Sequence, residues 1–71
     1  MFVIEYVASP IGVEHPVLFD ELALGSTVEE AKDQADTHLP AMQAKYGARG
    51  YRIFDRDKRR VATGPAGFSD G

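Results

Sequence analysis

The 71-residue sequence contains no cysteine. The chain can therefore form neither a disulfide bond nor a thiolate metal site. A domain of this size buries only about 60% of the surface of its unfolded chain, which leaves a small core and modest stability. Secreted domains with so small a core usually carry a disulfide. The absence of cysteine thus favours a reducing environment, and we expect a cytoplasmic protein.

The sequence also lacks a long apolar segment. No run of apolar residues approaches the roughly 20 that are needed to span a bilayer. The first nine residues, MFVIEYVAS, contain no basic residue, and Glu5 interrupts their apolar run, so they do not have the pattern of a signal peptide. We therefore expect a soluble protein that does not associate with membranes.

Motifs that mark catalytic or cofactor sites are absent. There is no Gly-x-Ser-x-Gly sequence, and no set of glycines has the spacing of a phosphate-binding loop. His15 and His38 are the two histidines, and His15 precedes a proline in a predicted loop. Because Asp36 and His38 are two residues apart on a predicted helix, they point in different directions. We expect no enzymatic activity, no cofactor and no metal site.

The charge is divided unevenly along the chain. The net charge is −3 at pH 7, whereas nucleic-acid-binding domains are often strongly basic. Residues 1–44 contain eight acidic residues and one basic residue, and residues 45–71 contain seven basic and three acidic residues. Two oppositely charged halves in so small a protein favour attraction within the fold or between subunits.

The N-terminal part predicts a strand pair. Residues 2–8 are rich in β-branched and aromatic side chains, which is typical of a strand. With a period of two, one face carries Phe2, Ile4, Tyr6 and Ala8, and the other carries Val3, Glu5 and Val7. Both faces are largely apolar, which indicates a central strand or one covered on its second face. Residues 9–12 predict a turn, and residues 17–19 a short returning strand, because Pro16 has no N–H to donate.

A helix is predicted from about residue 27 to residue 46. Two overlapping capping boxes could begin it, Ser26 with Glu29 or Thr27 with Glu30. One apolar stripe has helical spacing and is made of Val28, Ala31, Ala35, Leu39, Met42 and Tyr46. Gly47 is placed to end the helix in the left-handed conformation.

Pro40 lies inside this helical pattern. It cannot donate a hydrogen bond to the carbonyl of Asp36, and its ring clashes there, at a cost of ~3 kcal/mol in a straight helix. The apolar period nevertheless continues past it. We expect either a kinked helix or a break near His38, with Pro40 beginning a second short helix.

The C-terminal part predicts a hairpin of strands 50–54 and 59–63. A three-residue loop of Arg56, Asp57 and Lys58 would place Asp55 opposite Arg59, Ile53 opposite Val61 and Tyr51 opposite Thr63. Lys58 would then adopt the left-handed conformation that glycine prefers, at a cost of ~1 kcal/mol. In this register the residues that point away from the helix are Arg52, Phe54, Arg60 and Ala62.

Together these elements predict an α+β domain of residues 1–64. The expected architecture is a two-layer sandwich, in which one kinked helix covers one face of an antiparallel sheet of three or four strands in the order β-β-α-β-β. Residues 65–71 are expected to form a flexible C-terminal tail.

Two short signatures resemble a group of small bacterial domains of uncharacterised function. The first is a Ser-x-x-Glu-Glu-Ala helix start, here Ser26, Glu29, Glu30 and Ala31. The second is an Ile-x-Asp-x-Asp strand end, here Ile53, Asp55 and Asp57. The resemblance covers roughly residues 2–63 and departs from the usual hairpin at Lys58, where glycine is expected. It implies the β-β-α-β-β fold and no activity.

The side of the sheet opposite the helix is the first candidate site. One helix is about 10 Å wide and cannot cover both faces of a four-stranded sheet. Apolar side chains, with Leu18 among them, would remain on the open face, and apolar patches with polar rims commonly mark association surfaces. The candidate interface residues are Val3, Val7, Arg52, Phe54 and Arg60. We expect a non-enzymatic interaction module that forms a homodimer or binds a protein partner.

The basic hairpin is the alternative candidate site. Residues 51–63 hold five of the eight basic residues, and lysine and arginine bind nucleic-acid phosphates. The candidate nucleic-acid contacts are Arg52, Phe54, Arg56, Lys58, Arg59 and Arg60. However, charged hairpin tips also prevent edge-to-edge aggregation, and sheets that read RNA usually present more than one aromatic residue. Protein interaction is therefore the preferred hypothesis.

Overall fold

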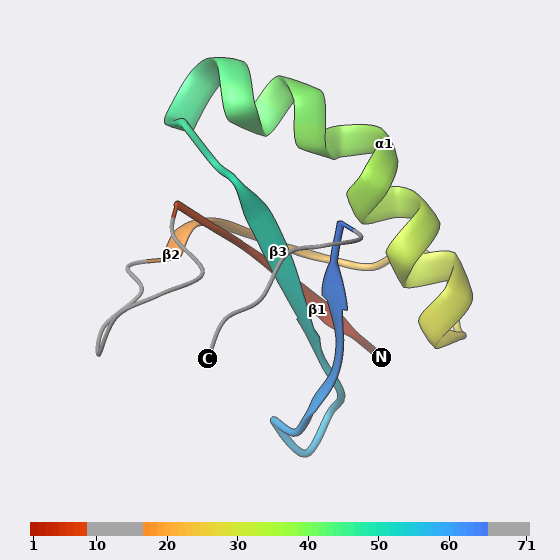
Figure 1. Ribbon diagram of the computed structural model, residues 1–71. Coiled ribbons are helices and arrows are strands. Elements are labelled where there is room, and N and C mark those ends of the chain that lie inside the picture. Colours follow the sequence, from red (N-terminus) through yellow and green to blue (C-terminus); the bar gives the residue numbers. More distant parts are fainter. Residues whose placement is uncertain (9–16, 66–71) are drawn as a thin grey trace.

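The structure is a computed structural model, and it describes residues 1–8 and 17–65. Its elements are β1 (Val3–Val7), β2 (Val17–Leu22), α1 (Val28–Tyr46), β3 (Gly50–Phe54) and β4 (Arg60–Gly64). The strands form one antiparallel sheet in the order β2-β1-β3-β4, and α1 lies across one face of it (Figure 1). The predicted α+β fold of a sheet packed against one helix is confirmed.

The strand predicted at residues 17–19 is present and extends to Leu22. The turn predicted at residues 9–12 and, apart from Pro65, the tail predicted at residues 65–71 lie outside the described residues. Within the described ranges, no helix combines the length and the apolar character that crossing a membrane requires.

Of the two possible capping boxes, the one that begins α1 joins Thr27 and Glu30. The Glu30 backbone N–H donates to Thr27 Oγ1 at 3.1 Å, and the Thr27 N–H donates to Glu30 Oε1 at 3.2 Å. Glu30 Oε1 also accepts from the Ser26 backbone N–H at 3.0 Å, so one carboxylate satisfies two backbone donors before the helix. These hydrogen bonds lower the pKa of Glu30, that from the Ser26 backbone most. Gly47 ends the helix with φ 76°, as predicted.

Pro40 does not break the helix. The helix is continuous from Val28 to Tyr46, with Pro40 on its exposed side. The ribbon of α1 changes direction along its length, which agrees with the kinked form of the prediction (Figure 1). A bend lets the apolar stripe continue along the sheet while the proline ring faces away from it.

The core lies between α1 and the two central strands. Ile4 and Tyr6 of β1 and Tyr51 and Ile53 of β3 are fully buried. From the helix, the predicted stripe supplies three buried residues, Ala31, Ala35 and Leu39. The two alanines leave room for the aromatic rings, which meet edge to face at 6.4 Å between centroids of Tyr6 and Tyr51.

Tyr46, the last residue of the predicted stripe, lies at the rim of the core instead of within it. Its ring is partly exposed and stacks on the ring of Phe19 in β2, with 5.6 Å between the ring centroids and an angle of 13° between the planes. This aromatic pair joins the end of α1 to the outer strand of the sheet.

The predicted hairpin turn between β3 and β4 is confirmed. The Asp55 N–H donates to the Arg59 carbonyl at 2.9 Å, and the Lys58 N–H donates to the Asp55 carbonyl at 3.0 Å. Lys58 has φ 65°, the left-handed conformation predicted for it. The Asp55 side chain stabilises the turn by accepting from the backbone N–H groups of Asp57 at 2.8 Å and Arg59 at 2.9 Å.

Beyond the turn, the predicted register of this hairpin is wrong. A register shift between Ile53 and Phe54 places Ile53 opposite Ala62 and Tyr51 opposite Gly64, not opposite Val61 and Thr63. Ala62 consequently packs against the core, whereas the sequence placed it on the open face. A β-bulge of this kind inserts one extra residue and turns the rest of the strand over.

The physical reason for the shift is the volume of Tyr51. Its ring is fully buried and lies directly against Gly64, so that a Cβ added to Gly64 would come within 2.9 Å of Tyr51 Cε1. No residue larger than glycine can stand opposite Tyr51 without displacing the ring. The bulge moves Thr63 away from this position and brings Gly64 into it.

We therefore expect Gly64→Ala to destabilise the protein by about 1–3 kcal/mol, the usual cost of overpacking a filled core. Thr63→Ala, at the neighbouring position on the other face, provides the control and should change stability by only about 0.5 kcal/mol. Urea denaturation of both variants measures the difference. Equal effects of the two substitutions would show that Gly64 is not confined by Tyr51.

Candidate functional site

The open face of the sheet consists of three rows of side chains that run across the strands. Ile4 and Ile53 face α1, so by strand alternation their neighbours face the other way. Residues opposite each other on adjacent strands share a face. The apolar row is Leu22, Val3 and Phe54, with Arg60 at its β4 end. The charged row is Asp20, Glu5, Arg52 and Thr63, and the third row is Val17, Val7 and Gly50.

The charged row has acids at one end and a base toward the other. Arg52 Nη2 lies 3.6 Å from Glu5 Oε1, and their side chains are only 16% and 26% exposed. Asp20 continues the acidic side on β2, at the edge of the sheet. The row thus changes sign between β1 and β3, that is, at the middle of the sheet.

The apolar residues of this face differ in exposure. Leu22 is 56% exposed, and Val3 and Phe54 are half-buried. Val7 faces the open side as predicted, but it has no exposed surface, so it cannot contribute area to a new contact. Leu18, which the sequence also placed on this face, packs against the helix-side core. It does so because the register of β1 and β2 shifts between Tyr6 and Val7.

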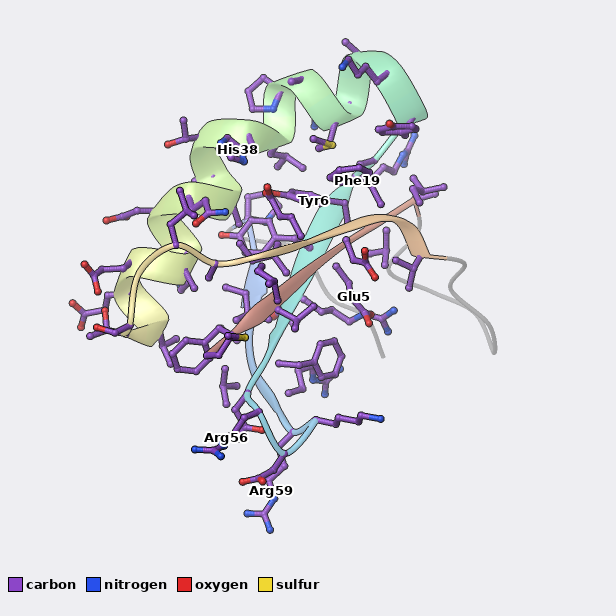
Figure 2. The ribbon with its side chains drawn as sticks, turned by 180° about the vertical axis from the view of Figure 1, so that it is seen from behind. Glu5, Tyr6, Phe19, His38, Arg56 and Arg59 are labelled. Carbon is purple, nitrogen blue, oxygen red and sulfur yellow. The ribbon has the colours of Figure 1, made fainter. Side chains whose placement is uncertain are left out.

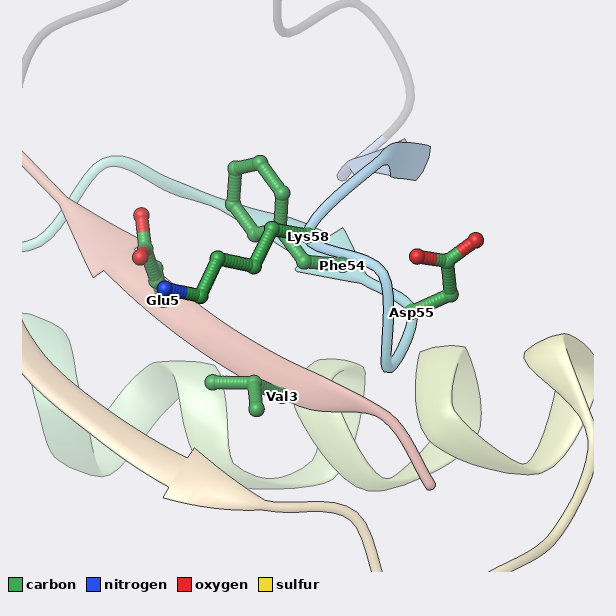
Figure 3. Close-up of a pocket in the computed structure, with 5 residues that line it drawn as sticks. All are labelled: Val3, Glu5, Phe54, Asp55 and Lys58. Carbon is green, nitrogen blue, oxygen red and sulfur yellow. The ribbon is translucent and has the colours of Figure 1, made fainter.

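A hollow of about 350 Å³ lies beside the apolar row. It is lined by Val3, Glu5, Phe54, Asp55 and Lys58 (Figure 3). The Phe54 ring and Val3 supply its apolar surface, and the Lys58 side chain runs from the hairpin turn back over β1 in the direction of Glu5 (Figure 3). Asp55 points away from the other four, since its carboxylate holds the turn. The hollow therefore has an apolar floor and one charge of each sign at its rim.

The six candidate nucleic-acid contacts do not form one surface. Arg56 and Arg59 are exposed at the far end of the hairpin and point away from the body of the protein (Figure 2). Arg52 lies instead within the sheet, largely covered and beside Glu5. Phe54 is the one aromatic residue that the described strands place on the open face. Of the remaining two, Arg60 is exposed opposite Phe54, and Lys58 lines the hollow.

A hydrogen-bonded cluster on the helix side joins Glu21 of β2 to Tyr6 and His38. Tyr6 and His38 are labelled in Figure 2. The Tyr6 hydroxyl donates to Glu21 Oε2 at 2.5 Å, and His38 Nδ1 lies 2.7 Å from the same oxygen. Glu21 was not identified from the sequence as the partner of His38, for which Asp36 was considered instead. Asp36 in fact accepts from the Tyr51 hydroxyl at 2.5 Å. The signal that could have found Glu21 is strand alternation, because Glu21 and Phe19 share the helix side once the strand is extended to Leu22.

The cluster shifts the pKa values of Glu21 and Tyr6. Burial alone would raise the pKa of Glu21, but the hydrogen bonds from Tyr6 and His38 and the charge of His38 outweigh it, so the pKa of Glu21 is lowered. Burial, together with the hydrogen bond to Glu21, raises the pKa of Tyr6. Burial and the bond to Asp36 likewise raise the pKa of Tyr51. Both phenols therefore remain neutral and donate to carboxylates. Their hydrogen bonds, with that of His38, connect the helix to the sheet and β1 to β2.

Metal binding finds no support in the described part of the chain. Among residues 1–8 and 17–65, no three histidine or carboxylate side chains gather at one point. His15 lies outside the described residues.

A scan against protein-family models and searches of curated proteins and of solved structures found no match to this chain. Functional inference therefore rests on the geometry of the Glu21 cluster, the basic hairpin and the open face.

The lowered pKa of Glu21 predicts the direction of one pH effect. A carboxyl group whose pKa is lower in the folded state stabilises the protein at pH values above 4.5, the ordinary pKa of glutamate. This contribution is lost as the pH falls through the pKa of the folded state. We expect Glu21→Gln to lose about 1–3 kcal/mol at neutral pH, because Tyr6 and His38 lose a charged partner. The loss should shrink below pH 4.5.

Urea denaturation between neutral pH and pH 3 measures this effect. Glu29→Gln, which removes a carboxylate from an exposed position in the first turn of α1, is the matched control and should follow the wild-type profile. A difference between Glu21→Gln and wild type that stays constant down to pH 3 would contradict the role given to the Glu21 carboxylate.

Proposed function

We propose that the protein is a non-enzymatic interaction module that forms a homodimer through the open face of its sheet. The observation that carries the proposal is the change of sign along the charged row, between Glu5 and Arg52. A surface that is acidic on one side of its centre and basic on the other is complementary to a copy of itself turned by 180°. The absence of cysteine supports a cytoplasmic location for such a module.

The geometry of a dimer follows from the order of the strands. A two-fold axis parallel to the strands, between β1 and β3, places β1 of one copy over β3 of the other. Each row of one copy then lies over the same row of the second copy, with the order of its residues reversed. Glu5 lies over Arg52 of the second copy, and Val3 lies over Phe54 of the second copy. Sheets packed in this way keep their strands within about 30° of each other, which preserves these central contacts.

The area of the face sets the strength of the association. The three rows of the open face hold eleven residues. Stable interfaces use about 20–30 residues on each partner. The face alone is therefore too small for a tight dimer, and we expect reversible association with a Kd in the micromolar range or weaker.

Phe54→Glu should abolish the dimer, because it places a carboxylate against Val3 of the second copy, with no room for water. Leu24→Glu is the matched control, since Leu24 is 92% exposed and lies after the end of β2. Sedimentation velocity at about 10–500 µM, a range chosen for a weak dimer, should show that Phe54→Glu associates more weakly than wild type, whereas Leu24→Glu associates as strongly as wild type. A monomeric wild type throughout this range would remove the proposal.

Nucleic-acid binding through the hairpin is the alternative function, and the exposed Arg56 and Arg59 are the observation in its favour. Glu5 and Asp20 oppose it, because they place carboxylates on the same face as Phe54. Titration with single-stranded and duplex oligonucleotides at two salt concentrations separates the functions. Binding that weakens steeply with salt would favour the alternative, whereas we expect none.

A further inference from the structure

Strand β2 is an outer edge of the sheet, and the described residues place no strand beyond it. Edge strands expose backbone N–H and C=O groups, and proteins usually protect them with lysine, proline or a bulge. Residues Val17–Leu22 contain neither lysine nor proline, and the register shift of this strand lies at its beginning, so that Phe19–Leu22 pair regularly with β1. Val17, Phe19 and Leu22 are exposed. The edge therefore has both the hydrogen-bonding groups and the apolar surface that a further strand would need.

The hydrogen-bond pattern identifies the free backbone groups. The Ala23 N–H donates to the carbonyl of Phe2 at 2.9 Å, across the strand pair β1–β2. Bonded and non-bonded residue pairs alternate along an antiparallel ladder. Glu21 and Phe19 therefore bond to β1, whereas the backbone groups of Leu22 and Asp20 point outward from the sheet.

The side chain of Gln34 already occupies one end of this edge. Its Oε1 accepts from the Leu24 N–H at 2.7 Å, and its Nε2 donates to the Leu22 carbonyl at 3.2 Å. The Gln34 amide thus satisfies the Leu22 carbonyl and the Leu24 N–H, two groups that would otherwise be free to bond a neighbouring strand. The part that remains for a partner is therefore centred on the N–H and C=O of Asp20, together with the Leu22 N–H.

The opposite edge of the same sheet carries the opposite charge. Strand β4 is the other outer strand, and Arg59 and Arg60 at its beginning are exposed. On β2 the exposed charged residue is Asp20, with Glu21 beside it. Val61 of β4 is an exposed apolar residue, as are those of β2. The two edges are thus complementary in charge and similar in their apolar content.

The strand directions also match. Each strand is antiparallel to its neighbours, so β2 runs opposite to β4. A second copy moved sideways along the sheet without being turned over would place its β4 antiparallel to β2 of the first. A further shift by two residue positions along the strands brings Arg60 beside Asp20 and keeps both side chains on the open face. We propose that the β2 edge binds the β4 edge of a second copy of this chain, centred on Asp20 and Arg60.

Charge disfavours the two alternative pairings of edges. A two-fold pairing of β2 with β2 brings the Asp20 carboxylates of both copies together, and a pairing of β4 with β4 brings together their arginines. The pairing of β2 with β4 joins different surfaces and leaves one edge of each kind free. Such a contact continues from copy to copy unless the rotation between copies closes a ring. It therefore differs from the face-to-face dimer, which ends at two copies.

The experiment uses the Phe54→Glu protein, so that the face-to-face dimer does not contribute. Sedimentation velocity at low salt over roughly 10–500 µM should show a weight-average mass that rises past the dimer with concentration. Adding Asp20→Pro should return the protein to a monomer, because proline removes the outward N–H and none of the bonds to β1. Circular dichroism checks that this variant folds.

Asp20→Lys is a second variant that keeps the backbone donor, and it should weaken the association at least tenfold by placing like charges together. Glu29→Lys makes the same change of charge in the first turn of α1 and should leave the association unchanged. The proposal is overturned if Asp20→Pro and Asp20→Lys associate as strongly as their parent, if association stops at a dimer, or if the parent is a monomer throughout. None of these results affects the wild-type dimer test, which depends on Phe54.

Discussion

The packing of α1 on Ile4, Tyr6, Tyr51 and Ile53 is the contact on which the rest of the structure depends. These four side chains come from the two central strands, and burying them fixes which face of every strand lies under the helix.

Two of the four buried residues are tyrosines, so their hydroxyls need partners as well as space. Glu21 accepts from Tyr6, and Asp36 accepts from Tyr51. The requirement for space explains the alanines of α1 and the glycine opposite Tyr51. The requirement for hydrogen bonds explains why an outer strand carries an acid on its helix side. His38 completes this arrangement by binding the same carboxylate from α1.

Local signals in the sequence were sufficient for much of this fold. The capping residues at 26–30, the glycine at 47 and the left-handed Lys58 depend on interactions within a few residues, and they are where the sequence placed them. The two register shifts could not be predicted, because each depends on how side chains from distant parts of the chain share the core. The contact of His38 with Glu21 joins residues 17 positions apart, so helix periodicity could not indicate it. The full burial of Val7 is likewise a tertiary property.

With one face of the sheet fixed under the helix, the other face and both edges remain as surfaces. The open face carries opposite charges on the two sides of its centre, and so do the two edges, and both proposed arrangements therefore involve a second copy of the chain. For a domain with so small a core, such association would also add buried surface. The central claim is that Glu5 of one copy meets Arg52 of the other.

Mixing two charge-reversed variants tests this claim most directly. Both variants also carry Asp20→Pro, so that the edge contact does not contribute. Copies of Arg52→Glu are acidic at both central positions, and copies of Glu5→Arg are basic at both, so each variant alone should remain a monomer. An equimolar mixture pairs each acid with a base, and sedimentation velocity should then show a dimer that contains one copy of each. A mixture in which both variants stay monomeric, although each is folded, would contradict the account.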